Sequence, residues 1–278
     1  MTSSSHLHPL DEALQLAASA PGQYQGQTHP GYWNMVGPFG GITAATLLQA
    51  VMQHPDRLGE PLSLTVNYAG ALAAGPFSVQ ATPVRTNRST QHWTLSILQA
   101  GADGAQVVTT TATAVTAARR ETWSVSDLPM PSVQPPAQHA TVPPQVGTIE
   151  WLNRYEMRPI AGFIPEAWDG SGDHSLSQLW MRDAPPRPLD FCALAALADL
   201  FFPRVWLRRA RHVPAGTVSI TVYFHASSAQ LQATGTGYLL GQARGQEFRN
   251  GFFDQTVQLW NEAGLMLATS HQIVYFKE

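Results

Sequence analysis

The sequence of 278 residues predicts an α+β fold made of two similar units, each an apolar helix packed against an antiparallel sheet. The prediction rests first on a repeat. The segment Leu-Ser-Leu-Thr-Val-Asn-Tyr at 62–68 returns 156 residues later, at 218–224, as Val-Ser-Ile-Thr-Val-Tyr-Phe. An apolar, Ala-containing segment precedes each copy, and strand-like segments follow each copy in the same order. A unit that occurs twice in one chain predicts a duplicated fold, and the seam between the copies is the expected place for a ligand.

The first unit begins with a strand-like stretch near residues 22–33, before an apolar segment at 42–53. Apolar residues recur there every three or four positions, which predicts a helix with one buried face that ends before Pro55. Strand candidates follow at 62–68, 76–85, 91–98 and 106–115. The last two are joined through glycines and an aspartate at 101–104, which are typical of a hairpin turn.

Residues 127–147 contain six prolines and few large apolar side chains. Proline removes a backbone donor, so this segment fits neither an interior strand nor a helix. We therefore predict a first unit at 1–126, a semi-extended linker at 127–147 and a second unit at 148–278.

The second unit repeats the plan. A strand is predicted at 177–182 and a helix at 189–202, ended by Pro203. A basic loop containing Arg204, Arg208, Arg209 and Arg211 comes next. Strands are predicted at 217–225, 231–243, 251–260 and 265–276. The closing hairpins also match, because the segment at 94–98 corresponds to the one at 256–260.

The alternation within the two repeated strands predicts which side chains meet the helices. Leu62, Leu64, Val66 and Tyr68, with their counterparts Val218, Ile220, Val222 and Phe224, are expected on the helix-facing side. The polar residues between them, including Thr217, Ser219 and Thr221, are expected on the opposite face.

Charge and composition exclude several classes of partner. A net charge of −3 with 13% charged residues gives no general attraction for nucleic acid or an anionic membrane. No apolar run approaches the roughly 20 residues that span a bilayer, and the first residues lack the order of a signal peptide, so we expect a soluble cytoplasmic protein without membrane insertion. The one cysteine, Cys192, lies in an apolar run and is expected in the core. His6 and His8 lack a third ligand, so no metal site is predicted.

A long apolar helix wrapped by an antiparallel sheet, duplicated in one chain, resembles the double hot-dog fold. Three segments sharpen this likeness: Gly-Pro-Phe-Gly-Gly-Ile at 37–42, Pro-Leu-Asp at 188–190 before Ala-Ala-Leu-Ala-Asp at 195–199, and the terminal stretch 252–272. Together they resemble the thioesterase-like relatives of bacterial acyl-CoA thioesterase II. The resemblance implies hydrolysis of an acyl-CoA to the free acid and CoA in fatty acid metabolism, with no cofactor and with assembly as a homodimer or homotetramer.

In the acyl-CoA thioesterase II family, an Asp on the second helix, a Thr on the next strand and a Gln on the last strand hold the hydrolytic water. Local context places these roles at Asp199, Thr217 and Gln272. Thioester hydrolysis needs an acceptor for the proton of the water, a polar group that orients the water, and donors for the developing oxyanion. Backbone amides of Gly40 and Gly41, at the start of the first helix, are candidate oxyanion donors. The two glycines would equally allow close packing of helix and sheet.

Several alternatives remain open from the sequence. Asp199 could instead be a solvated or capping carboxylate, and Gln272 an outward-facing polar residue, while Ser219 or Thr221 could take the place of Thr217. Arg208 and Arg209 are candidates for the CoA phosphates, but a basic loop is more often solvated surface. The run at 217–221 departs from the more acidic strand of the family, which keeps a non-catalytic acyl-CoA or lipid-binding protein as the alternative, and a role in polyketide or aromatic-acyl metabolism as a third. The first helix has no carboxylate at the matching place, so we expect one site per chain.

Overall fold

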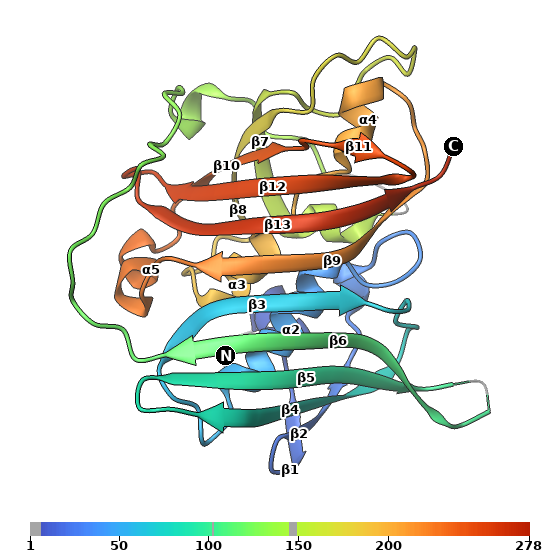
Figure 1. Cartoon of the computed structure of the whole chain (residues 1–278). Coiled ribbons are helices and arrows are strands. Elements are labelled where there is room, and N and C mark those ends of the chain that lie inside the picture. Colours follow the sequence, from blue (N-terminus) through green and yellow to red (C-terminus); the bar gives the residue numbers. More distant parts are fainter. Residues whose placement is uncertain (1–6, 102, 145–148) are drawn as a thin grey trace, which may run out of the picture.

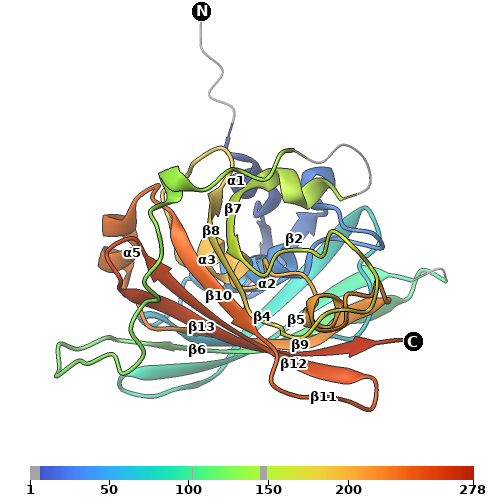
Figure 2. The same cartoon turned by 90° about the horizontal axis from the view of Figure 1, so that it is seen from above.

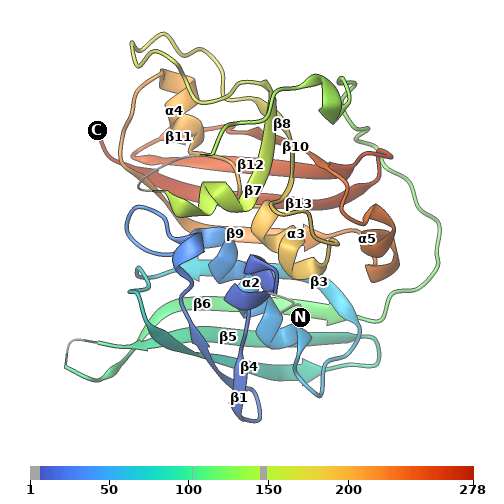
Figure 3. The ribbon, with the colours of Figure 1, turned by 180° about the vertical axis from the view of Figure 1, so that it is seen from behind.

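The computed structural model describes residues 7–101, 103–144 and 149–278. Within these residues, thirteen strands form one antiparallel sheet, and two central helices, α2 (Gly40–Met52) and α3 (Phe191–Leu197), lie together on one face of it (Figure 1, Figure 3). Seen from above, the sheet curves around these helices (Figure 2). The predicted α+β tandem hot-dog architecture is confirmed.

The sheet has one half from each repeat, and the halves meet at β3 and β9. Its order is β1-β2-β4-β5-β6-β3-β9-β13-β12-β10-β8-β7, with β11 paired to β12. The first half comprises β1 (Ala17–Ala20), β2 (Gln23–Gln27), β3 (Glu60–Tyr68), β4 (Pro76–Thr86), β5 (Thr90–Ala100) and β6 (Gln106–Ala117). The second half comprises β7 (Tyr155–Ala161), β8 (Ser177–Asp183), β9 (Ala215–Phe224), β10 (Leu239–Arg244), β11 (Phe248–Arg249), β12 (Phe252–Asn261) and β13 (Met266–Phe276).

The two copies of the repeat pair with each other at the seam. In the β3–β9 ladder Thr65 lies opposite Thr221, and their hydroxyl oxygens are 3.0 Å apart. These two residues are also equivalent positions in the repeat. The approximate twofold axis of the chain therefore passes between them, and it turns both apolar strand faces toward the helices.

The central helices are almost completely buried, because small and apolar residues occupy nearly every position. They run antiparallel. Gly41 at the start of α2 lies against the Ala196 carbonyl near the end of α3, while Cys192 at the start of α3 donates its thiol to Gln49 of α2. Cys192 is buried, as predicted. No helix among the described residues is long and apolar enough to cross a membrane.

The second central helix is shorter than predicted. It ends at Leu197, and Ala198 is its C-cap, rather than continuing to residue 202. The Ala198 carbonyl accepts a hydrogen bond from the buried Ser270 hydroxyl at 3.0 Å, so a side chain of β13 provides a hydrogen-bond donor for a carbonyl at the C-terminal end of the helix. Pro203 does not end this helix but precedes another, α4 (Arg204–Arg209), which replaces most of the predicted basic loop.

Several further elements differ from the prediction. Helices α1 (Pro9–Ala13) and α5 (Ser228–Thr234) were not expected. Helix α5 takes the beginning of the strand predicted at 231–243, because Ser227 and Gln230 form a capping box that starts a helix there. Only β2 forms a strand within residues 22–33, followed by the short η1 (Pro30–Tyr32).

Both repeated strands contain a β-bulge at the same position. The β3–β6 register shifts between Pro61 and Ser63, and the β9–β13 ladder shifts where Thr217 pairs with Val274 and Ser219 with Ile273. The residue skipped in β9, Val218, is 38% exposed. The predicted alternation is therefore wrong at this end of the strand, because one extra residue transfers Thr217 to the helix-facing side.

The segment between β6 and β7 contains the short helices η2 (Pro136–Gln138) and η3 (Glu150–Arg154). It passes along the outside of the second half (Figure 1). Met130 and Val133 pack against an apolar cluster that includes Trp180, whose indole donates to the Gln134 carbonyl at 2.9 Å. The unit boundaries proposed from the prolines remain a prediction, and residues 145–147 of that linker lie outside the described residues.

Arg119 ties the two halves together near the end of the seam. Its guanidinium donates to the carbonyls of Pro61 and Phe224 at 2.9 Å and pairs with Glu60 at 2.9 Å.

We expect Arg119→Ala to lower the free energy of unfolding by about 1–3 kcal/mol, measured by chemical denaturation. The exposed neighbour Arg120→Ala is the matched control. Equal stability of the two variants would contradict this role for Arg119.

Candidate active site

Asp199, Gln272 and Thr217 form one connected hydrogen-bonded group. The amide nitrogen of Gln272 donates to the carboxylate of Asp199 at 2.8 Å, and the hydroxyl of Thr217 donates to the amide oxygen of Gln272 at 3.2 Å. Asp199 follows α3, Gln272 lies on β13 and Thr217 on β9. Residues separated by up to 73 positions in the sequence are thus brought into direct contact.

The alternation of β13 explains why Gln272 faces inward. Ser270, Gln272 and Val274 are buried on the helix side, whereas Ile273 is 41% exposed on the other side. The outward-facing alternative for Gln272 is therefore excluded. When Asp199 is ionised, its carboxylate also fixes the orientation of the Gln272 amide, because a flipped side chain would place the amide oxygen against a carboxylate oxygen.

Asp199 is a buried acid. Burial raises the pKa of its carboxyl group from 3.8 to about 7, although hydrogen bonds from Gln272 and from the backbone amide of Gly41 oppose this shift. The same carboxylate contributes to the raised pKa values of Tyr68 and Tyr155, after the larger effect of their own burial. A carboxyl group with a pKa near 7 is divided between its two protonation states at neutral pH. The solvated alternative for Asp199 does not fit this burial.

The first turn of α2 points at Asp199. Phe39 occupies the N-cap and supplies no side-chain cap, so the leading amides of the helix are free for other partners. The Gly41 amide is used by the Asp199 carboxylate, which leaves the Gly40 amide as the remaining oxyanion candidate. A Cβ atom at position 40 would lie 2.6 Å from the Asp199 carboxylate, so Gly40 is needed for this approach. The Gly40 carbonyl accepts from the Tyr68 hydroxyl at 2.8 Å.

The bulge in β9 decides between the three hydroxyl candidates. Thr217 reaches Gln272 because the bulge places it on the helix side. Thr221 bonds instead to Thr65 on the seam. Ser219 precedes the buried Ile220 and so faces away from the helices. Thr217 is thus the hydroxyl residue of this strand that contacts the Asp199–Gln272 pair.

The arginines of α4 lie in different surroundings. Arg208 is exposed and donates one bond to the Gly172 carbonyl at 3.1 Å. Arg209 forms an ion pair with Glu278. Arg204, expected on a solvated loop, is instead fully buried. The structure therefore separates the four arginines of the predicted basic loop into one buried side chain, one paired side chain and two exposed ones, Arg208 and Arg211. It does not bring Arg208 and Arg209 together with Asp199.

The first half of the chain lacks the polar groups of this site. Gln272 pairs with Ile220, and the equivalent ladder pairs Ala114 with Leu64. Pro61 stands before the first bulge as Thr217 stands before the second. The symmetry-related positions thus offer neither an amide nor a hydroxyl side chain.

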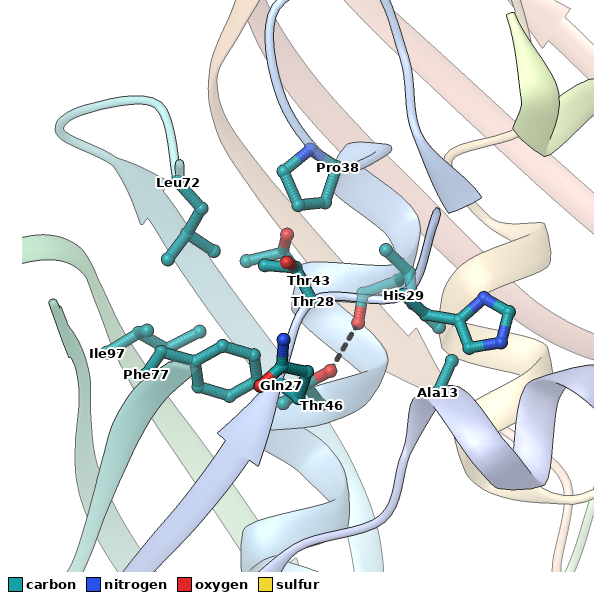
Figure 4. Close-up of a pocket in the computed structure, with 11 residues that line it drawn as sticks. Ala13, Gln27, Thr28, His29, Pro38, Thr43, Thr46, Leu72, Phe77 and Ile97 are labelled. Carbon is teal, nitrogen blue, oxygen red and sulfur yellow. Dashed lines mark hydrogen bonds between the residues drawn. The ribbon is translucent and has the colours of Figure 1, made fainter. Parts of the chain in front are cut away.

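A small pocket of about 20 Å³ lies between α2 and the first half of the sheet (Figure 4). Thr43 and Thr46 line it from α2, and Phe77 and Ile97 line it from β4 and β5. Both threonine hydroxyls bond back to helix carbonyls, so the walls are largely apolar. The lining does not include Asp199, which lies against Gly40 and Gly41 on another side of the helix. This cavity is separate from the hydrogen-bonded group.

Two residues of the site were not anticipated. Ser270 was missed although it alternates with Gln272, and Tyr68 was assigned only to the core. His8, considered for a metal, instead caps α1 by accepting from the Leu10 amide at 3.1 Å, while His6 lies outside the described residues. Within the described part of the chain, no three His, Cys, Asp or Glu side chains form a group that would hold a metal ion.

Comparison with known proteins gives matches along most of the chain. Residues 29–117 match the family model described as the acyl-CoA thioesterase N-terminal domain, and residues 126–276 match that of the acyl-CoA thioesterase C-terminal domain. A search of curated proteins found no match.

Among solved structures, a conserved hot-dog protein of unknown function from Alicyclobacillus acidocaldarius is 47% identical, with a TM-score of 0.91 over 98% of this chain and 99% of that chain. An acyl-CoA thioesterase II, TesB2, from Mycobacterium marinum is 18% identical, with a TM-score of 0.75 over 96% of this chain and 98% of that chain. The second likeness shows the fold alone.

Burial of Asp199 predicts a specific pH dependence of stability. The pKa of Asp199 is about 7 in the folded chain and near 3.8 in the unfolded chain. The folded chain therefore favours the protonated carboxyl group, and the free energy of unfolding falls as pH rises from about 4 to about 7. Asp199→Asn removes this loss. We expect the variant to gain about 2–4 kcal/mol relative to wild type between pH 4 and pH 8, measured by chemical denaturation at both values.

The comparison must be a difference between variants, because burial also raises the pKa of Asp183 to about 7 in both proteins. Asp173→Asn, which changes a carboxylate 88% exposed, serves as the control. A pH-independent difference between wild type and Asp199→Asn would show that Asp199 titrates normally.

Proposed function

The chain belongs to the acyl-CoA thioesterase family, with the N-terminal family domain followed by the C-terminal one, and we propose that it hydrolyses an acyl-CoA to the free acid and CoA. The observation that carries this proposal is the direct contact of Asp199 with Gln272, and of Gln272 with Thr217, beneath the uncapped start of α2. Each residue type has a role in hydrolysis by an activated water.

In the proposed reaction the Asp199 carboxylate accepts a proton from a water while the oxygen of that water attacks the thioester carbonyl carbon. Gln272 and Thr217 hold the carboxylate and the water in a fixed orientation. The tetrahedral intermediate then breaks its carbon–sulfur bond, releasing the acid and the CoA thiolate, which takes up the proton that Asp199 accepted from the water. A base with a pKa near 7 suits this task, because it is ionised at slightly alkaline pH yet still basic enough to remove a proton.

The negative charge that develops on the thioester oxygen needs donors. The first turn of α2 supplies backbone amides and the positive end of the helix dipole. Since the Gly41 amide donates a hydrogen bond to the Asp199 carboxylate, we assign the oxyanion contact to the Gly40 amide. Because Gly40 has no side chain, the start of α2 can lie close to the Asp199 carboxylate.

The CoA part of the substrate is anionic. Of the two arginines proposed for it, Arg208 has an exposed guanidinium, whereas Arg209 already has Glu278 as a partner. We therefore favour Arg208 for the CoA phosphates. One site per chain, assembly as a homodimer or homotetramer and a cytoplasmic location are retained as proposals from the sequence.

The direct test is release of free thiol from a panel of straight-chain, branched and aromatic acyl-CoAs. We expect wild-type turnover to rise with pH through about 7, as Asp199 loses its proton. Asp199→Asn should lower kcat/KM by about 100-fold or more and remove this rise. Tight acyl-CoA binding without thiol release from any member of the panel would instead support the non-catalytic binding protein.

Thr217 and Thr221 provide a matched pair on one strand. Thr217→Val removes the hydroxyl that holds Gln272, so we expect kcat to fall about tenfold. Thr221→Val removes the seam contact to Thr65 on the opposite face and should leave kcat unchanged. The assignment of Thr217 is wrong if the two substitutions have equal effects on kcat at temperatures where both variants are folded.

A further inference from the structure

Arg204 is a fully buried arginine without a carboxylate partner among the described residues. Its guanidinium bonds only to neutral oxygens. One terminal nitrogen donates to the Ser177 hydroxyl at 2.5 Å, the other donates to the Phe202 carbonyl at 2.5 Å, and Nε donates to the amide oxygen of Gln255 at 3.1 Å. The guanidinium also stacks over the Phe202 ring, 4.1 Å from its centre.

A buried cation without a counter-ion is costly, because neutral acceptors replace the hydration of the charge only in part. Burial accordingly lowers the pKa of Arg204 to about 9. An apolar side chain of similar volume would remove this cost. The stability of the fold therefore does not explain why an arginine occupies this position.

One set of contacts leads from Arg204 to the catalytic glutamine. Gln255 on β12 lies directly opposite Gln272 on β13, and both side chains are buried on the helix side. Directly opposed residues of an antiparallel ladder have Cβ atoms about 5 Å apart, so the two glutamines are neighbours. By binding the oxygen of the Gln255 amide, Arg204 fixes the side chain against which Gln272 packs.

A second set of contacts leads to the catalytic carboxylate. Asp199 lies at the start of an irregular segment that ends at Pro203, between α3 and α4. Arg204 donates from both Nε and a terminal nitrogen to the Phe202 carbonyl within this segment. Through Ser177 it ties the same segment to β8. The turn that presents Asp199 is thus held to two strands by one guanidinium.

We propose that Arg204 and Gln255 are positioning residues that align Gln272 with Asp199 for the hydrolysis. This inference rests on the proposed function for its catalytic consequence, while the alignment itself is a structural claim. Neither residue contacts the reacting atoms in this proposal. Their effect passes through the glutamine pair and through the turn after α3.

The test uses Gln255→Leu, which removes the amide but keeps the volume, with Arg204→Lys as a second variant that keeps the charge but loses the forked geometry. Gln258→Leu is the control, because Gln258 lies on the same strand but bonds to Gln242 on the opposite face. We expect Gln255→Leu and Arg204→Lys to lower kcat about tenfold with KM changed by less than twofold. Gln258→Leu should leave both constants unchanged.

A second readout is independent of turnover. If Gln255→Leu misaligns Gln272, Asp199 loses a hydrogen bond that lowers its pKa, so this pKa should move further upward. The shift is measured from the pH dependence of unfolding of Gln255→Leu with and without Asp199→Asn. An unchanged Asp199 pKa in folded Gln255→Leu, or an unchanged kcat where turnover exists, overturns the proposal. Absence of turnover in wild type counts against the thioesterase alone, and the pKa readout then decides the alignment.

Discussion

The pairing of β3 with β9 is the constraint on which the other features depend. Because each copy of the repeat faces its partner across an approximate twofold axis at Thr65 and Thr221, the two central helices must run antiparallel. The start of α2 therefore meets the end of α3. This arrangement brings the free amides of one unit to the carboxylate of the other, so neither half contains the complete group on its own.

The burial of Asp199 follows from the same arrangement and has opposing consequences. Burial removes the water that would solvate the carboxylate, and only the Gln272 amide and the Gly41 backbone replace it. Two hydrogen bonds are too few to keep the group ionised at low pH, and this incomplete solvation is what gives the carboxylate its basic character. Under the proposed mechanism, stability and reactivity are in conflict at this residue, as they often are at catalytic sites.

The sequence was sufficient for the architecture, and the three residues that it singled out, Asp199, Thr217 and Gln272, lie in one hydrogen-bonded group. Periodicity predicts α2 and most strands because these elements are set by simple burial of one face. It fails where a local interaction overrides the pattern: α3 ends early where Ser270 takes the Ala198 carbonyl, and the capping box at Ser227 starts α5 inside an expected strand. The buried state of Arg204 was unpredictable, because its partners come from separate segments. The exclusion of Thr221 also needed the bulge, which no alternation reveals.

That bulge occurs in both halves, although only the second half places a hydroxyl there. In the first half, Pro61 stands beside the bulge. Proline is unfavourable at an ordinary interior strand position because it has no backbone N–H to donate to the neighbouring strand. The bulge is thus a property of the backbone in both halves, whether or not a hydroxyl residue stands beside it. The first half therefore has the bulge but lacks the polar side chains. Polar residues introduced in place of Pro61 and Ala114 would already face the helices.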